Sequence, residues 1–168
     1  MQFKSFAAAA LLATAAASAS AVTYSVGTMP IAPAVYSNTA SLPFSAVPFS
    51  DRYNFVFPVG GSVASGSAVS VNVSGLLNIS NIQVSLFNAA NVVLASGGVG
   101  VSSQLFNTPL TAGASYYYTV TGTANGAVGG AYSFIASASP IPEPGTYALM
   151  LAGLGVVGFM AFRHRDRS

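Results

Sequence analysis

The sequence of 168 residues contains no cysteine, no tryptophan and very little charge. Only 5% of the residues are charged, whereas 52% are hydrophobic. Within residues 22–139 the sole charged residues are Asp51 and Arg52, and this stretch has no histidine, lysine or glutamate. A catalytic triad, a Cys–His pair, a carboxylate pair or a His/Cys metal site cannot be assembled from such a set. We therefore expect a protein that is not an enzyme, with no catalytic residue, no cofactor and no metal.

The formal net charge of +2 comes from the two ends of the chain rather than from a basic face. Lys4 lies near the N-terminus, and Arg163, Arg165 and Arg167 lie near the C-terminus. Binding to nucleic acid requires clustered basic side chains that neutralise phosphates, and the body of the chain has no such cluster. We expect no nucleic-acid partner.

The first 21 residues have the pattern of a secretory signal peptide. Lys4 supplies the positive start, and an apolar run follows over residues 6–17. The triplets 17–19 and 19–21 both read Ala-Ser-Ala, the small-x-small pattern that signal peptidase cleaves. The sequence predicts export across the inner membrane, with a mature chain that begins at Ser20 or Val22.

A second apolar run, residues 147–162, lies near the C-terminus and is followed by an arginine-rich tail. A helix of this length spans about 24 Å, less than the ~30 Å hydrocarbon core of a bilayer. Tyrosine and arginine at its ends can lengthen it, so the run predicts a single transmembrane helix across a thin bilayer. The basic tail (Arg163, Arg165, Arg167) would stop transfer and stay in the cytoplasm.

The three residues Pro142, Glu143 and Pro144 precede this helix directly. The tripeptide, the short Gly- and Leu-rich helix and the basic tail together resemble the PEP-CTERM sorting signal of Gram-negative bacteria. The resemblance covers residues 140–168 and implies processing near Pro142–Pro144 by an exosortase, a membrane-embedded protease or transpeptidase. It implies a transient inner-membrane precursor, held through residues 147–162, and a cell-surface or extracellular product. The alternative is a permanent single-pass anchor.

The body of the chain alternates apolar and polar residues in short runs. Such alternation is typical of half-buried strands, and it occurs in five places: residues 52–57, 69–74, 82–86, 116–121 and 132–134. Glycine, proline and asparagine clusters separate the runs, and no amphipathic helix is evident. The sequence therefore predicts an all-β fold, an antiparallel β-sandwich or jelly roll, between the signal peptide and the C-terminal helix.

The predicted domain organisation has four parts. Residues 1–21 form the signal peptide, residues 22–48 a Pro/Ser/Ala-rich leading segment, residues 49–139 the β-sandwich and residues 140–168 the sorting signal. The leading segment carries four prolines among small residues, so we expect an edge strand combined with irregular chain there.

The one charged motif in the body has the form F-x-D-x-Y-x-F, with Phe49, Asp51, Tyr53 and Phe55 at its fixed positions. Its sequence resembles the FxDxF-type PEP-CTERM proteins, with tyrosine at position 53 in place of phenylalanine. We expect a structural role, in which Asp51 accepts backbone hydrogen bonds and the aromatic side chains fill the core. A calcium or other ligand site is the alternative, but a single acid makes a poor site for a hard cation.

Two functional hypotheses follow. The first is an exported surface or matrix protein associated with exopolysaccharide or biofilm, a role that the PEP-CTERM resemblance implies, with exosortase and signal peptidase as processing partners. The second is a lectin-like module that binds a carbohydrate or a protein and stays anchored in the membrane. That module would need a concave patch of tyrosines with converging amide groups.

Overall fold

The computed structural model describes residues 20–43, 47–140 and 144–165. Apart from Ser20 and Ala21, the predicted signal peptide lies outside these residues. Nine strands precede one helix along the described chain, and their bounds are β1 Thr23–Thr28, β2 Tyr36–Leu42, β3 Val47–Val56, β4 Val63–Val71, β5 Ile79–Asn88, β6 Val93–Ser96, β7 Ser102–Pro109, β8 Ser115–Ala124, β9 Gly130–Ser139 and α1 Pro144–Arg165.

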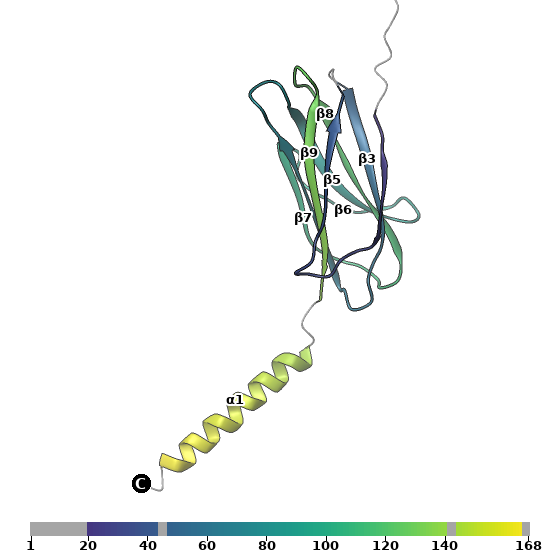
Figure 1. Cartoon of the computed structure of the whole chain (residues 1–168). Helices are drawn as coiled ribbons and strands as arrows, with labels where there is room; N and C mark the ends of the chain where they lie inside the picture. The colour runs from purple at the N-terminus through teal and green to yellow at the C-terminus, as the bar shows by residue number, and fades with distance from the viewer. Residues whose placement is uncertain (1–19, 44–46, 141–143, 166–168) are drawn as a thin grey trace, which may run out of the picture.

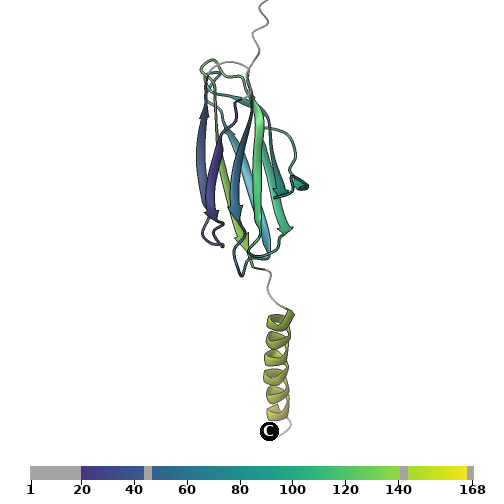
Figure 2. The same ribbon diagram turned by 90° about the vertical axis from the view of Figure 1, so that its right-hand side faces the viewer.

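The strands form two sheets that pack face to face (Figure 1). One sheet has the order β1-β3-β8-β5-β6 and the other the order β2-β9-β4-β7. If β2 to β9 are renumbered 1 to 8, the first sheet has the order 2-7-4-5, with β1 added at its edge beside strand 2. The second sheet has the order 1-8-3-6. These are the orders of the two sheets of a jelly roll, so the predicted all-β sandwich is confirmed in this form. Figure 2 shows that the strands run along the long axis of the sandwich.

One strand pair departs from the predicted antiparallel arrangement. β1 runs parallel to β3, from Thr23 opposite Arg52 to Thr28 opposite Val56, with an irregularity between Ser25 and Gly27. The reason is topological, because the chain crosses to β2 in the other sheet before it returns as β3. Parallel neighbours need such a crossover, whereas antiparallel neighbours need only a hairpin.

The leading segment supplies both β1 and β2, each at the edge of a different sheet. β2 pairs with β9 from Tyr36 opposite Ala136 to Leu42 opposite Gly130. Between the two strands Met29 is buried in the core. Both strands of the leading segment therefore pair with strands of the sandwich, β1 with β3 and β2 with β9.

The core between the sheets is rich in aromatic rings. Tyr53 stacks on Tyr24 at 4.7 Å and on Phe134 at 4.3 Å between ring centroids. Phe49 stacks on Tyr132 at 5.3 Å. These rings come from β1, β3 and β9, so aromatic contacts join the two sheets as well as neighbouring strands.

In β4 the alternation points the opposite way from the sequence-based interpretation. Val69 and Val71 are exposed, whereas Ala64, Gly66 and Ala68 are buried. The small residues face inward because the large rings opposite need the space: a Cβ added at Gly66 would lie 2.9 Å from Cε1 of Tyr118. The apolar face of a strand is therefore not always its inner face when its partner sheet carries bulky side chains.

The predicted C-terminal helix forms as α1. Residues 148–158 and Met160, the part of this helix whose exposure the structure describes, are all exposed. Across the described residues, however, no helix meets the length and apolarity required to span a membrane. The helix is therefore confirmed, whereas its passage through a bilayer stays a prediction.

Candidate functional site

The C-terminal segment places the motif residues at the start and end of α1. Pro144 is the first helical residue, a position where its missing N–H costs nothing and its fixed φ suits the helix. Arg163 and Arg165 lie in the last turn. Pro142, Glu143 and Arg167 lie outside the described residues.

In the sandwich, the F-x-D-x-Y-x-F motif lies on β3 with its four fixed residues facing the core. Phe49, Asp51, Tyr53 and Phe55 are each at most 3% exposed. The intervening polar residues face outward, as the period of two in a strand requires. The inner face of the motif therefore packs in the core, whereas its outer face carries Ser50, Arg52 and Asn54.

The carboxylate of Asp51 is fully enclosed and has two hydrogen-bond donors. The backbone N–H of Val22 donates to Oδ1 at 2.9 Å, and the hydroxyl of Tyr132 donates to Oδ2 at 2.6 Å. The Tyr132 hydroxyl also bonds the Tyr53 hydroxyl at 2.8 Å, and Asn38 donates to Tyr53 at 3.2 Å. This chain of hydrogen bonds joins β3 of one sheet to β9 and β2 of the other.

Burial raises the pKa of both tyrosines in this chain far above the ordinary value of 10, so both hydroxyls stay protonated donors. Asp51 itself is 1% exposed. Within the ranges that the structure describes, no three His, Cys, Asp or Glu residues lie close enough together to hold a metal ion. The geometry suits a structural carboxylate.

On the outer face of the five-stranded sheet, Arg52 lies over a tyrosine. Its guanidinium carbon is 3.5 Å from the ring centroid of Tyr117, and its Nε donates to Oδ1 of Asn54 at 2.8 Å. Tyr117 stacks on Phe87 of β5 at 4.9 Å with almost parallel planes. The Tyr117 ring and the Asn54 amide therefore hold the Arg52 guanidinium in place.

The turn that joins β5 to β6 holds this tyrosine from its other end. Oδ1 of Asn88 accepts the N–H groups of Ala90 at 3.0 Å and Val92 at 2.9 Å. Asn91, in a left-handed conformation with φ of 61°, accepts a hydrogen bond from the Tyr117 hydroxyl at 2.9 Å. The turn thus fixes the ring that carries Arg52.

A shallow depression of about 250 Å³ lies beside this cation. Its polar lining comes from Ser25, Arg52, Asn54 and Ser115, and its remaining walls include Tyr116 and Tyr117. Ser25, Asn54 and Tyr117 belong to one row across three strands. Gly27, with φ of 75° and open space where a Cβ would stand, leaves the rim open.

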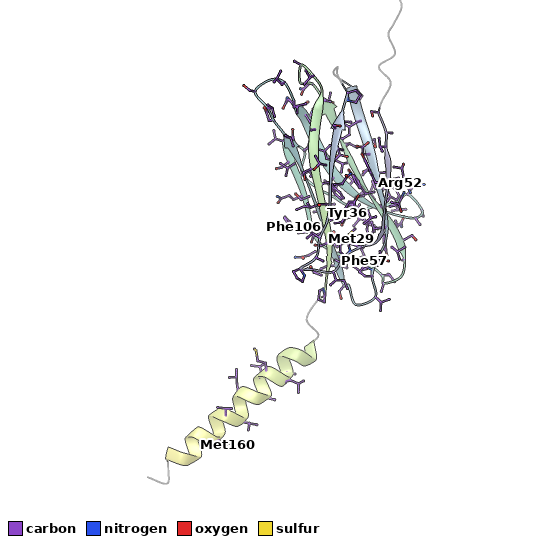
Figure 3. The ribbon with its side chains drawn as sticks, in the orientation of Figure 1. Met29, Tyr36, Arg52, Phe57, Phe106 and Met160 are labelled. Carbon is purple, nitrogen blue, oxygen red and sulfur yellow. The ribbon has the colours of Figure 1, made fainter. Side chains whose placement is uncertain are left out.

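The outer face of the other sheet has a different character. An apolar groove of about 190 Å³ is lined by Phe106, Ile135 and Val35 together with serines of β4 and β9. Phe106 is 67% exposed. Figure 3 shows Phe106 and Arg52 on opposite sides of the sandwich, with Tyr36 and Met29 between them.

Tyr117 lies on the outer face of β8, but Arg52 covers its ring and the residue is only 6% exposed. Sequence reasoning did not identify the depression. Its residues come from β1, β3, β8 and the β5–β6 turn. The one signal for it in the sequence was that Arg52, the only cation of residues 22–139, directly follows Asp51 of the motif.

Comparison with known families identifies the C-terminal segment. The family model of the PEP-CTERM protein-sorting motif matches residues 140–165, which include all of α1. The chain carries a PEP-CTERM sorting motif. The motif implies an exported protein that an exosortase processes after membrane-anchored sorting. No curated protein matches the chain.

Two solved structures overlap the sandwich at low identity. The pre-peptidase C-terminal domain of collagenase from Bacillus anthracis is 19% identical, with a TM-score of 0.42, over 67% of this chain and 93% of that domain. The carbohydrate-binding module CBM36, in complex with calcium and xylotriose, is 20% identical with a TM-score of 0.33, over 66% of this chain and 93% of that one. Both scores are low.

Proposed function

We propose that this chain is a non-enzymatic protein that is exported, sorted through its PEP-CTERM motif and released or displayed at the cell surface, where the jelly roll associates with exopolysaccharide. The observation that carries the proposal is the match of residues 140–165 to the sorting motif. Export by a cleaved signal peptide and a transient stay at the inner membrane belong to this proposal.

The intact mass of the protein from the host tests the sorting step. In the normal host we expect a product that ends near Pro142–Pro144. In a strain without exosortase we expect a membrane-held form that keeps residues 147–168. Extra mass on the released form would report an attached group. A complete C-terminal helix in both strains would contradict the proposal.

For the sandwich, we infer that the depression beside Arg52 contacts the polysaccharide, and that it prefers sugars with a carboxylate. Arg52 is the only cation of the described sandwich, and its guanidinium is held in place by Tyr117 and Asn54. An oriented guanidinium can bind a carboxylate through two parallel hydrogen bonds. Ser25 and Ser115 add hydroxyl groups that match those of a sugar.

The size of the depression fits one sugar unit rather than a large ligand. At about 250 Å³ it lies just below the range of about 300–1,000 Å³ typical of pockets for drug-sized molecules. A repeating acidic polymer could occupy it with one uronic acid while neighbouring units remain in solvent. The low charge of the sandwich leaves Arg52 as the main electrostatic contact.

Calorimetry with an oligogalacturonate and its carboxyl-reduced form tests this surface on the exported protein. Arg52→Gln should weaken binding of the acidic oligomer by about tenfold or more, equivalent to about 1.4 kcal/mol. Gln104→Ala, an exposed change on β7, should leave it unchanged. Equal binding of the acidic and reduced oligomers, or an unaffected Arg52→Gln variant, would contradict the assignment. An acidic peptide that competes fully would indicate a protein ligand instead.

A second candidate function, a lectin-like module that keeps its C-terminal helix, is favoured by the same depression. It differs from the first in the fate of the helix. Retention of residues 147–168 on the mature protein in the normal host, together with specific oligosaccharide binding, would select this candidate.

A further inference from the structure

The buried carboxylate of Asp51 has no counter-charge in the described chain. It is the only carboxylate among the described residues, since Glu143 and Asp166 lie outside them. The one cation of the sandwich, Arg52, points to the opposite face of β3 and lies on Tyr117. An isolated charge removed from water costs several kcal/mol unless it is paired or well hydrogen-bonded.

The groups around Asp51 are neutral hydrogen-bond donors and aromatic rings. Tyr132 on β9 donates to Oδ2. Tyr53 on β3 bonds Tyr132, and Tyr24 on β1 stacks on Tyr53. All three have a raised pKa and are uncharged at neutral pH. The remaining oxygen, Oδ1, accepts the N–H of Val22 at 2.9 Å.

Val22 is one of the two residues at which the mature chain is expected to begin. We propose that signal peptidase cleaves between Ala21 and Val22, and that the new α-ammonium group of Val22 forms an ion pair with the buried carboxylate of Asp51. This inference rests on the export proposed above. The nitrogen that donates to Oδ1 would become the counter-ion that the described chain lacks.

Contacts that lie after the cleavage site also hold Val22 in place. Its carbonyl oxygen accepts the N–H of Arg52 at 2.8 Å, and β1 begins at the next residue with Thr23 opposite Arg52. These contacts to β3 remain after cleavage, so the nitrogen stays within hydrogen-bond distance of Oδ1. Cleavage would therefore change the charge at this point without changing the backbone path.

A chain that began at Ser20 would keep two more hydrogen bonds. Ser20 donates to the Pro48 carbonyl at 3.2 Å and accepts from the Ser50 N–H at 2.9 Å. Ser50 is exposed, so in a chain that begins at Val22 water can replace the Ser20 carbonyl as the acceptor of the Ser50 N–H. Water cannot reach Asp51 in the same way, because this residue is 1% exposed. The counter-charge therefore favours the start at Val22.

The chemistry is an ordinary peptide hydrolysis. Water adds across the bond between Ala21 and Val22, so that Ala21 leaves with a new carboxylate and Val22 gains an amine. The amine takes up a proton at neutral pH and becomes the ammonium group. Folding after cleavage then brings this cation to Asp51.

The composition makes the new N-terminus easy to follow. The sequence has one lysine, Lys4, which the cleavage removes with the signal peptide. The α-amine of the exported chain is then its only primary amine, and an amine-reactive ester labels that group alone. An ammonium held by a carboxylate yields its reactive free-base form less readily.

The first measurement is the intact mass of the exported protein, which should correspond to a start at Val22. The second is the labelling rate near neutral pH, which should be about tenfold or more lower in the folded protein than in urea, because an opposite charge at this distance typically changes proton affinity by at least that factor. Asp51→Asn should restore most of the rate. Tyr132→Phe keeps the carboxylate and should restore much less of the labelling rate. The comparison distinguishes loss of the negative charge from a general loosening of the fold.

Each outcome decides between the two proposals. A start at Ser20 would leave export standing and overturn the ion pair. A start at Val22 with equal labelling rates in the folded and urea-unfolded protein would also overturn it, even if Asp51→Asn does not fold. A mature protein that retains Met1 would contradict both the export and this inference.

Discussion

At the scale of single residues, two inward-facing glycines, Gly66 and Gly122, mark where aromatic rings need room. Gly122 of β8 lies directly opposite Phe49 of β3. A Cβ added there would lie 2.9 Å from both Cγ2 of Ile79 and Cε1 of Phe49, closer than real contacts allow. The Phe49 ring thus covers the bare backbone of its partner strand and stacks on Tyr132 from the other sheet.

We expect Gly122→Ala to lower the free energy of unfolding by about 1–3 kcal/mol, the usual cost of overpacking a core. Gly98→Ala is the matched control, because a Cβ at Gly98 would meet no atom within 4 Å. Urea unfolding followed by circular dichroism gives both values. Equal stabilities of the two variants would show that Phe49 and Ile79 move aside freely.

The limits of sequence reasoning are also clear at this scale. The alternation in residues 52–57 was enough to predict that Tyr53 and Phe55 face the core. The hydrogen-bond partner of Asp51 could not be predicted, because Tyr132 lies 81 residues away in the sequence and on the other sheet. Only the arrangement of the strands brings these two side chains together.

At the scale of elements, the predicted strands are the ones whose two faces differ most. β3, β4, β5, β8 and β9 each contain part of one of the five predicted runs, and they are the inner strands of both sheets, although the alternation in β4 points the opposite way. β6 and β7 were missed because they are edge strands with much of their surface exposed, so their sequences lack a strong pattern.

The turn between β5 and β6 gives a prediction at the element scale. Asn88→Ala removes the acceptor of two backbone N–H groups, which should cost about 1–2 kcal/mol locally. Hydrogen exchange of the amides of β6 should become about 5- to 30-fold faster, while β9 stays protected. Gln104→Ala provides the control. Faster exchange in all strands alike would show that the turn contributes only to global stability.

At the scale of the whole molecule, the tyrosines make the sandwich sensitive to alkali. Burial raises the pKa of Tyr53, Tyr118 and Tyr132 above the ordinary value of 10. The charged form of tyrosine is the deprotonated one, so a raised pKa in the folded state stabilises the fold fully below pH 10. This contribution is lost as the pH rises further.

We therefore expect the free energy of unfolding to fall above pH 10 by up to ~1.4 kcal/mol per pH unit for each of these tyrosines. Tyrosinate absorbance and circular dichroism should change together. Tyr118→Phe should reduce the slope and cost little at neutral pH, because the Tyr118 hydroxyl is buried without a hydrogen-bond partner among the described residues. Tyrosinate absorbance that rises near pH 10 with the fold intact would contradict the expectation.

The last strand determines how the sandwich responds to mechanical tension. β9, which leads to the sorting segment, is not an edge strand: it pairs with β2 along seven residues and with β4 along nine. A pull on its C-terminal end acts along the strand and perpendicular to the hydrogen bonds of both ladders. These bonds must then give way together, in shear, rather than one after another. A molecule held by this end while its surroundings flow past would transmit the load through the middle of a sheet.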